Sequence, residues 1–225
     1  MLRRAFAELL GSALLAATVV GSGIAASRLS PDDEGLQLLE NALVTGAVLV
    51  ALILALGPVS AAFNPVVTLT ERLLGAISTR TAAGLAVVQV LGCSAGVVVA
   101  NLMFDLPAVT VSETTRSGAG LLLGEAVATF GLVLVVFGVV RSGRKDQVAY
   151  AVGAYITAAY WFTSSTSFAN PAITVARTLS DTFAGIAPAS VGPFVALQLV
   201  GGLLALGAVV LLYPDAREIA EEIAS

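Results

Sequence analysis

The sequence contains two asparagine–proline pairs, Asn64-Pro65 and Asn170-Pro171, each followed by two apolar residues and a threonine. Asparagine is a preferred helix N-cap and proline is favoured at the first helical position, so each pair predicts the start of a helix. Each asparagine can cap the backbone and still offer an amide donor to a passing oxygen atom. The candidate functional boxes are therefore Asn64, Pro65, Val66, Asn170, Pro171 and Ala172.

The helices that follow these boxes are expected to be too short to cross a membrane. They run from Pro65 to about Gly75 and from Pro171 to about Phe183. A helix of about 11 residues is about 16 Å long, roughly half of the ~30 Å hydrocarbon core. Two helix starts that meet in mid-membrane leave free N–H groups and a partial positive charge. Such a point favours neutral hydroxylated or water-like solutes and repels cations and hydrated protons.

Two carboxylates lie inside apolar segments, Glu8 near the start of the chain and Glu125 in its second half. An ionisable residue within a membrane span is a functional candidate by default. A proton relay would need a chain of ionisable partners, and the sequence has no histidine. We therefore favour a supporting role, in which each carboxylate accepts hydrogen bonds from the loop before the half-helix of its own half. Gln89 and Gln198 are expected to brace the same loops.

Composition places these residues in a membrane protein. Of the 225 residues, 57% are hydrophobic and 12% are charged, whereas soluble domains carry about 25% charge. The charges cluster and leave long apolar gaps, which predicts membrane spans, and the length fits a single domain of residues 1–225. With one cysteine and no histidine, we expect no metal site and no cofactor. The expected spans are 4–26, 37–57, 80–103, 119–140, 147–163 and 191–213.

The two halves of the chain repeat this order of features. Residues 1–104 and 117–214 each contain a glutamate, an asparagine–proline box and a glutamine in the same sequence. Three spans per half give the halves opposite topology, as in inverted-repeat membrane proteins whose broken helices meet at the midplane. Eight lysines and arginines fall on the N-terminal side and three on the other, which predicts cytoplasmic termini. Residues 215–225 are expected to form a charged cytoplasmic tail.

The paired boxes, the two glutamates and the arrangement of six spans with two half-helices resemble the aquaporin, or major intrinsic protein, family. The resemblance covers nearly the whole chain. The stretches 18–24 and 103–107 look like a bacterial branch associated with arsenite and other neutral solutes. The resemblance implies an all-α membrane fold, the aquaporin-like bundle. It also implies a homotetramer with one pore per subunit, in the inner membrane of a bacterial cell.

The boxes depart from the family pattern at two points. Val66 replaces the usual alanine, which is expected to widen an apolar wall slightly. Ile173 stands where most members have an arginine, and Arg177 follows one helical turn later. Four residues return a helix to nearly the same face, about 6 Å further along. Arg177 is therefore either a displaced selectivity arginine or a solvated side chain paired with Asp181, and both hypotheses stay open.

The resemblance also implies a constriction. The positions that correspond to it are expected to form a wide and mostly apolar neck, which lacks bulky aromatic side chains and histidine. Tyr160, Trp161 and Phe162 are interpreted instead as an interfacial aromatic belt. The constriction residues expected are Thr45 (or Val44, because the loop before the first box is one residue shorter than the usual pattern), Ala158, Ser167, Ile173 and Arg177.

Together these patterns predict a passive channel for small uncharged solutes: water, glycerol-like polyols, urea and neutral metalloid hydroxides. Its expected partners are membrane lipid and these solutes, without nucleic acid. An ion-coupled secondary transporter is the alternative, because inverted repeats and broken helices fit it equally well. An enzyme is not expected, because the serines at 164, 165 and 167 have no histidine base in the sequence.

Overall fold

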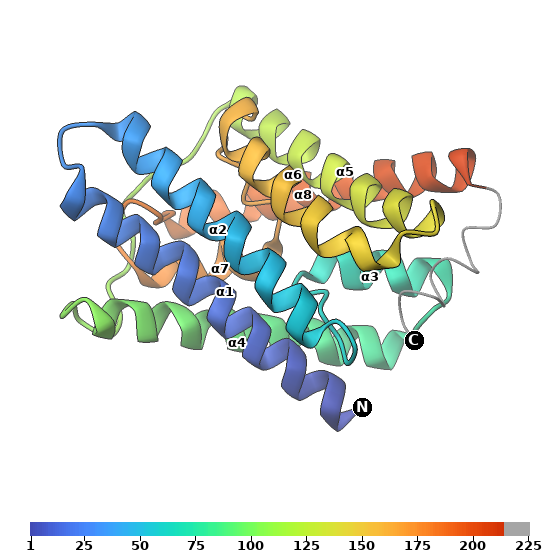
Figure 1. The fold of residues 1–225 in the computed structure, drawn as a ribbon. Helices are drawn as coiled ribbons and strands as arrows, with labels where there is room; N and C mark the ends of the chain where they lie inside the picture. The colour runs from blue at the N-terminus through green and yellow to red at the C-terminus, as the bar shows by residue number, and fades with distance from the viewer. Residues whose placement is uncertain (214–225) are drawn as a thin grey trace.

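The computed structural model describes residues 1–213, and this part of the chain is helical, without strands. Figure 1 shows the helices packed side by side in one bundle. The all-α fold expected from the sequence is therefore confirmed. The expected tail, 215–225, lies outside the described residues. The helices are α1 (Leu2–Leu29), α2 (Glu34–Leu56), α3 (Pro65–Leu74), α4 (Thr79–Met103), α5 (Ala119–Arg141), α6 (Val148–Phe162), α7 (Pro171–Ala176) and α8 (Pro188–Leu212), with 3-10 turns η1 (Lys145–Gln147) and η2 (Arg177–Leu179).

Five of these helices, α1, α2, α4, α5 and α8, are long and apolar enough to cross a membrane. The sixth expected span is α6, which has only 15 residues. At 1.5 Å per residue it is about 22 Å long, and η1 extends it at the N-terminal end. Large apolar side chains such as Leu91, Leu203 and Leu204 are at least half exposed, at 58%, 50% and 61%. An apolar exterior of this kind fits the hydrocarbon of a bilayer.

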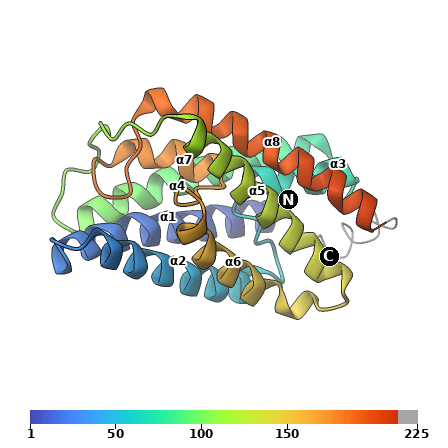
Figure 2. The same cartoon turned by 90° about the horizontal axis from the view of Figure 1, so that it is seen from above.

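The half-helices α3 and α7 lie in opposite ends of the bundle, as Figures 1 and 2 both show. Helix α3 ends as expected, at Gly75 with φ of +93°, a backbone conformation that glycine tolerates well. Helix α7 is shorter than predicted: its α-helical part ends at Ala176 and its 3-10 turn at Leu179, not near Phe183. The chain after Leu179 is held by α4 instead of continuing the helix, because Asn101 donates to the Leu179 carbonyl and accepts from the Ser180 hydroxyl.

Glycines let the long helices cross closely in pairs. A Cβ atom on Gly96 of α4 would lie 2.0 Å from the Ala13 carbonyl oxygen of α1. In the second half, a Cβ atom on Gly201 of α8 would lie 2.2 Å from the Ala126 carbonyl oxygen of α5. Both distances are far below van der Waals contact, so glycine is required at these crossings. The pairs α1–α4 and α5–α8 are the equivalent walls of the two halves that hold the half-helices.

Candidate functional site

The two half-helices meet at their capped first residues. The Asn64 side-chain oxygen accepts from the Val66 N–H at 2.9 Å, and the Asn170 oxygen accepts from the Ala172 N–H at 3.0 Å. Each asparagine then reaches into the other half. The Asn64 amide nitrogen donates to the Ala169 carbonyl at 2.8 Å, and the Asn170 amide nitrogen donates to the Phe63 carbonyl at 2.8 Å. Two hydrogen bonds thus join the starts of the half-helices.

Glu8 holds the loop before α3. Its carboxylate, which is fully buried, accepts from the Ala62 and Phe63 N–H groups at 2.8 Å each. It also accepts from the Ser60 hydroxyl at 2.6 Å and the Gln89 amide at 2.8 Å. Charge-assisted bonds of this kind contribute about 1.5–3 kcal/mol each. Glu8 therefore ties α1 and α4 to the loop that positions Asn64.

Glu125 makes the equivalent contacts in the second half. Its carboxylate accepts from the Phe168 N–H at 2.9 Å and the Ala169 N–H at 3.0 Å, and Gln198 donates to it as well. Gln198 also donates to the Thr174 hydroxyl at 2.8 Å, as Gln89 does to Thr68 at 2.9 Å. These groups therefore connect the half-helices to the walls of the bundle. Each carboxylate thus accepts hydrogen bonds from the loop before the half-helix of its own half, as expected for a supporting role.

The residue directly before each asparagine has a left-handed backbone conformation, in which its N–H and its carbonyl both form hydrogen bonds. Phe63 has φ of 48° and Ala169 has φ of 47°, at equivalent positions directly before the asparagines. Positive φ is uncommon for residues with a side chain and needs support from the surroundings. At both residues the N–H group donates to a glutamate of the same half and the carbonyl accepts from the asparagine of the other half.

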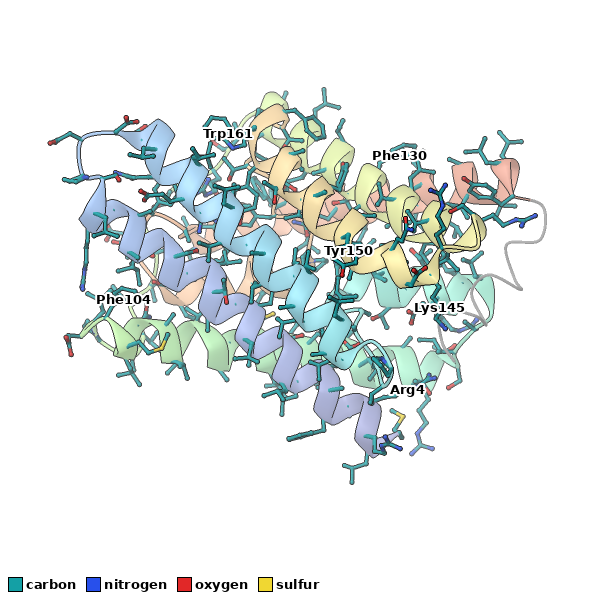
Figure 3. The ribbon with its side chains drawn as sticks, in the orientation of Figure 1. Arg4, Phe104, Phe130, Lys145, Tyr150 and Trp161 are labelled. Atoms are coloured by element: carbon teal, nitrogen blue, oxygen red, sulfur yellow. The ribbon has the colours of Figure 1, made fainter. Side chains whose placement is uncertain are left out.

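A cavity of about 520 Å³ runs along this junction. One end, called the N-terminal mouth below, is lined by Arg4, Glu71, Lys145 and Asp146. The other end, called the distal neck, is lined by Thr45, Tyr160, Ser167, Phe168, Ile173 and Arg177. Both Asn64 and Asn170 also line the cavity. Figure 3 shows Arg4 and Lys145 at the end of the bundle where the chain begins, and Phe104 at the opposite end.

Of the expected constriction residues, Thr45, Ser167, Ile173 and Arg177 line the cavity. Two others do not. Val44 is 45% exposed, and Ala158 is also exposed on the outer face of α6. The cavity face of α2 repeats every four residues, through Thr45, Leu49 and Ile53. Val44 is turned about 100° away from this face because it precedes Thr45 by one residue.

Tyr160 takes the place expected for Ala158, and its assignment to an interfacial belt was wrong. It is 5% exposed, lines the distal neck, and its hydroxyl lies 3.3 Å from the Thr45 hydroxyl in a hydrogen bond. The neck is therefore less open and more polar than expected. A signal was present in the sequence, because Val152, Ile156 and Tyr160 recur every four residues and share one face of α6. Its neighbour Trp161 is 50% exposed, as expected for a belt residue.

Val66 and Ala172 are buried behind the cavity and do not line it. The expectation that Val66 widens the wall of the passage is therefore wrong. A Cβ atom on Gly202 of α8 would lie 2.2 Å from a Val66 methyl carbon, so the valine fills space left by the glycine. The departure from alanine in the first box is accommodated between helices and leaves the passage unaffected.

Arg177 lies at the distal neck and is only 4% exposed, which rules out the solvated alternative. Its guanidinium donates to the Ala184 carbonyl and stacks on Phe168, 3.4 Å from the ring centroid. Asp181 accepts instead from the Glu113 N–H at 3.0 Å. The other hypothesis, in which Arg177 is a displaced selectivity arginine that faces the passage one turn beyond Ile173, agrees with this geometry.

The long apolar helices, with two half-helices capped tip to tip beside an elongated cavity, define the class of protein as a membrane channel. The chain belongs to the major intrinsic protein family, whose family model matches residues 1–159. It is 48% identical over 218 residues to "Aquaglyceroporin AqpS" of Rhizobium meliloti (strain 1021), across 96% of this chain and 93% of the relative. The family resemblance inferred from the boxes and glutamates is thereby confirmed.

A solved structure shares the fold. The X-ray structure of the aquaglyceroporin from Plasmodium falciparum superposes with a TM-score of 0.72 at 18% identity, over 96% of this chain and 98% of that one. Family and fold together make this chain a passive channel of the membrane, and the major intrinsic proteins are in general not enzymes. The alternative of an ion-coupled transporter gains no support from these relatives.

Proposed function

We propose that water and small uncharged solutes of glycerol size pass along the cavity between the half-helices. The observation that carries this proposal is the reciprocal bonding of Asn64 and Asn170, at 2.8 Å each, beside the cavity. It leaves a passage whose centre presents amide groups and no titratable side chain. The name of the relative, an aquaglyceroporin, supports the same class of solute. Urea and neutral metalloid hydroxides belong to the proposed range because they too are small and uncharged.

The distal neck is proposed to select among these solutes. Its lining includes polar groups: the hydroxyls of Thr45 and Tyr160 and the guanidinium of Arg177. The Ser167 hydroxyl is buried beside the cavity and has no hydrogen-bond partner among the described residues. Ile173 and Phe168 add apolar surface to the same lining. A polyol, which carries both hydroxyl groups and carbons, matches this mixed lining because unpaired polar groups are costly to bury.

The test is solute flux through purified protein in liposomes without any ion gradient. Thr45→Trp places a bulky ring at the distal neck, and Val44→Trp places the same ring on the exposed face one residue away. We expect wild type and Val44→Trp to pass glycerol at similar rates, and Thr45→Trp to pass it at least about tenfold more slowly. Equal fluxes in both tryptophan variants would contradict the proposed pathway, and a requirement for an ion gradient would favour the coupled transporter.

The orientation and assembly are also proposals. We propose that the N-terminal mouth faces the cytoplasm of a bacterial cell, in the inner membrane, because lysines and arginines concentrate on that side. We also propose a homotetramer with one passage per subunit, which rests on the family resemblance. Labelling of single cysteines introduced at Arg3 and Thr114 tests the orientation, and the mass of the protein in native nanodiscs tests the assembly.

A further inference from the structure

The positive charge at the distal neck accounts for the exclusion of cations but not for the exclusion of anions. Arg177 is buried beside the cavity, and two helix starts add partial positive charge at its centre. A buried positive field repels cations, but it also attracts anions. A passage that admits only uncharged solutes therefore needs a second element of opposite sign. The residues that line the cavity contain one buried carboxylate, Glu71.

Glu71 and Arg177 occupy equivalent positions in the two halves. Each stands seven residues after the asparagine of its own half, so each lies two turns along its half-helix. In both halves the residue four positions earlier, Val67 or Ile173, lines the cavity on the same face. Because the halves are inverted, the arginine marks the distal neck and the carboxylate marks the N-terminal mouth. The two charges thus bracket the asparagine pair from opposite sides.

The surroundings of Glu71 keep it within the passage. It is 8% exposed, whereas Arg4 is half-buried and Lys145 and Asp146 are exposed at the same mouth. Figure 3 shows Arg4 and Lys145 at this end of the bundle. Glu71 is therefore the most deeply buried of the four charged residues that line this mouth. A charge that is shielded from water acts more strongly on a passing ion than an exposed one does.

We propose that Glu71 is a specificity-determining residue that rejects anions at the N-terminal mouth, complementing the rejection of cations by Arg177 at the distal neck. The inference rests on the proposed function, in that neutral solutes must pass both points. It assigns the chemical class that each end excludes: a deprotonated weak acid or a halide at the carboxylate, and a metal or ammonium cation at the guanidinium.

The protonation of Glu71 makes this filter depend on pH. Glu71 lies in the last turn of α3, outside the five spans, and its pKa is raised to about 7, chiefly because the carboxylate is buried. The charge of Glu8 contributes to this increase in pKa and that of Arg4 opposes it, while Lys145 and Asp146 face the same mouth. Above that pH the carboxylate is charged and rejects anions. Below it the group is neutral, and the rejection is lost.

The experiment measures iodide influx into liposomes that contain the full-length protein and an iodide-quenched dye, with glycerol flux recorded on the same sample. For wild type we expect low iodide influx at about pH 8 and an increase on the order of tenfold at about pH 5.5. Glu71→Gln should show the high influx at both pH values with glycerol flux within about twofold of wild type. Glu71→Asp should restore the dependence on pH. Asp146→Asn, which removes an exposed carboxylate from the same mouth, is the matched control and should behave as wild type.

Two results would overturn the inference separately from the proposed function. Iodide influx equal to wild type in Glu71→Gln at both pH values, with glycerol flux intact, removes the anion filter and leaves the channel. Equal changes in Glu71→Gln and Asp146→Asn reduce the effect to surface charge and also remove it. Absence of glycerol flux in wild type would instead remove the proposed function and the inference with it. If Glu71→Gln does not fold, the response of wild type and Glu71→Asp to pH decides.

Discussion

Asn64 and Asn170 are linked through each other's loops: each donates its amide at 2.8 Å to the carbonyl of the residue that precedes the other asparagine. The same two residues cap their own half-helices through their side-chain oxygens. Each asparagine therefore uses both ends of its amide group. Neither loop is complete without the other half, so the two halves of the chain are expected to order their loops together.

Asn170→Ala removes the cap of α7 and one of the two cross-bonds. We expect a loss of about 2 kcal/mol in the free energy of unfolding and a several-fold loss of glycerol flux. Thermal melting in detergent and flux in liposomes measure the two effects. Asn170→Asp retains the oxygen that caps Ala172 but not the donor to Phe63, so it separates the cap from the cross-bond. A melting temperature of Asn170→Ala equal to that of wild type would contradict this account.

Glu125→Gln replaces one acceptor oxygen by an NH₂ group that faces backbone donors. The N–H of Phe168 or of Ala169 then loses its partner, and we expect a destabilisation of about 2–4 kcal/mol. Glu8→Gln should cost more, because Glu8 accepts from four groups and Glu125 from three. Denaturation of the purified variants tests the order. Glu113→Gln, at an exposed position, is the control and should melt as wild type does.

Arg177→Ala removes the buried cation from the distal neck. We expect cation leak through the channel to rise by an order of magnitude or more, while glycerol flux does not fall. A potassium-sensitive dye in liposomes gives the leak on the same sample as the solute flux. Asp181→Asn keeps the acceptor for Glu113 and should leave the cation leak unchanged. A leak that rises equally in both variants would assign the effect to the outer loop and not to the arginine.

Gly202→Ala should destabilise the protein through a clash with Val66. The added Cβ atom would lie 2.2 Å from a Val66 methyl carbon, and overpacking of this kind costs about 1–3 kcal/mol. Val66→Ala opens space at the same contact, so the double variant should recover most of the loss. A double-mutant cycle measured by melting gives the coupling energy. Additive effects of the two substitutions would show that they do not share this contact.

The boxes were readable from the sequence because capping is local. Asn64 and Asn170 bond to N–H groups two residues later, so the order of residue types along the chain is sufficient to predict the helix starts. The supporting role of Glu8 was likewise inferred without the structure, from the absence of other ionisable partners within the spans. The loop residues that donate to Glu8 lie 52 to 55 positions after it in the sequence, and Gln89 lies 81 positions after it.

The lining of the distal neck was only partly predicted because it depends on how helices are turned. Thr45 and Val44 are adjacent, and the sequence left open which of them faces the cavity. Tyr160 was assigned to the membrane interface because its neighbours Trp161 and Phe162 are of the same type. A rotation of about 100° per residue separates a buried ring from two exposed ones. The four-residue repeat of Val152, Ile156 and Tyr160 indicates the buried face of α6, whereas the run of three aromatic residues considered by type alone does not.

The sequence by itself determined the class of fold, the repeated order of features and the starts of both half-helices, because hydropathy and helix caps act over a few residues. Only the tertiary structure decided which side of each helix faces the passage, where Arg177 and Glu71 lie, and how Val66 is accommodated. These outcomes depend on packing between segments more than a hundred residues apart, such as Thr45 with Tyr160 and Val66 with Gly202. No local pattern encodes such contacts, since they exist only once the two halves have closed on each other.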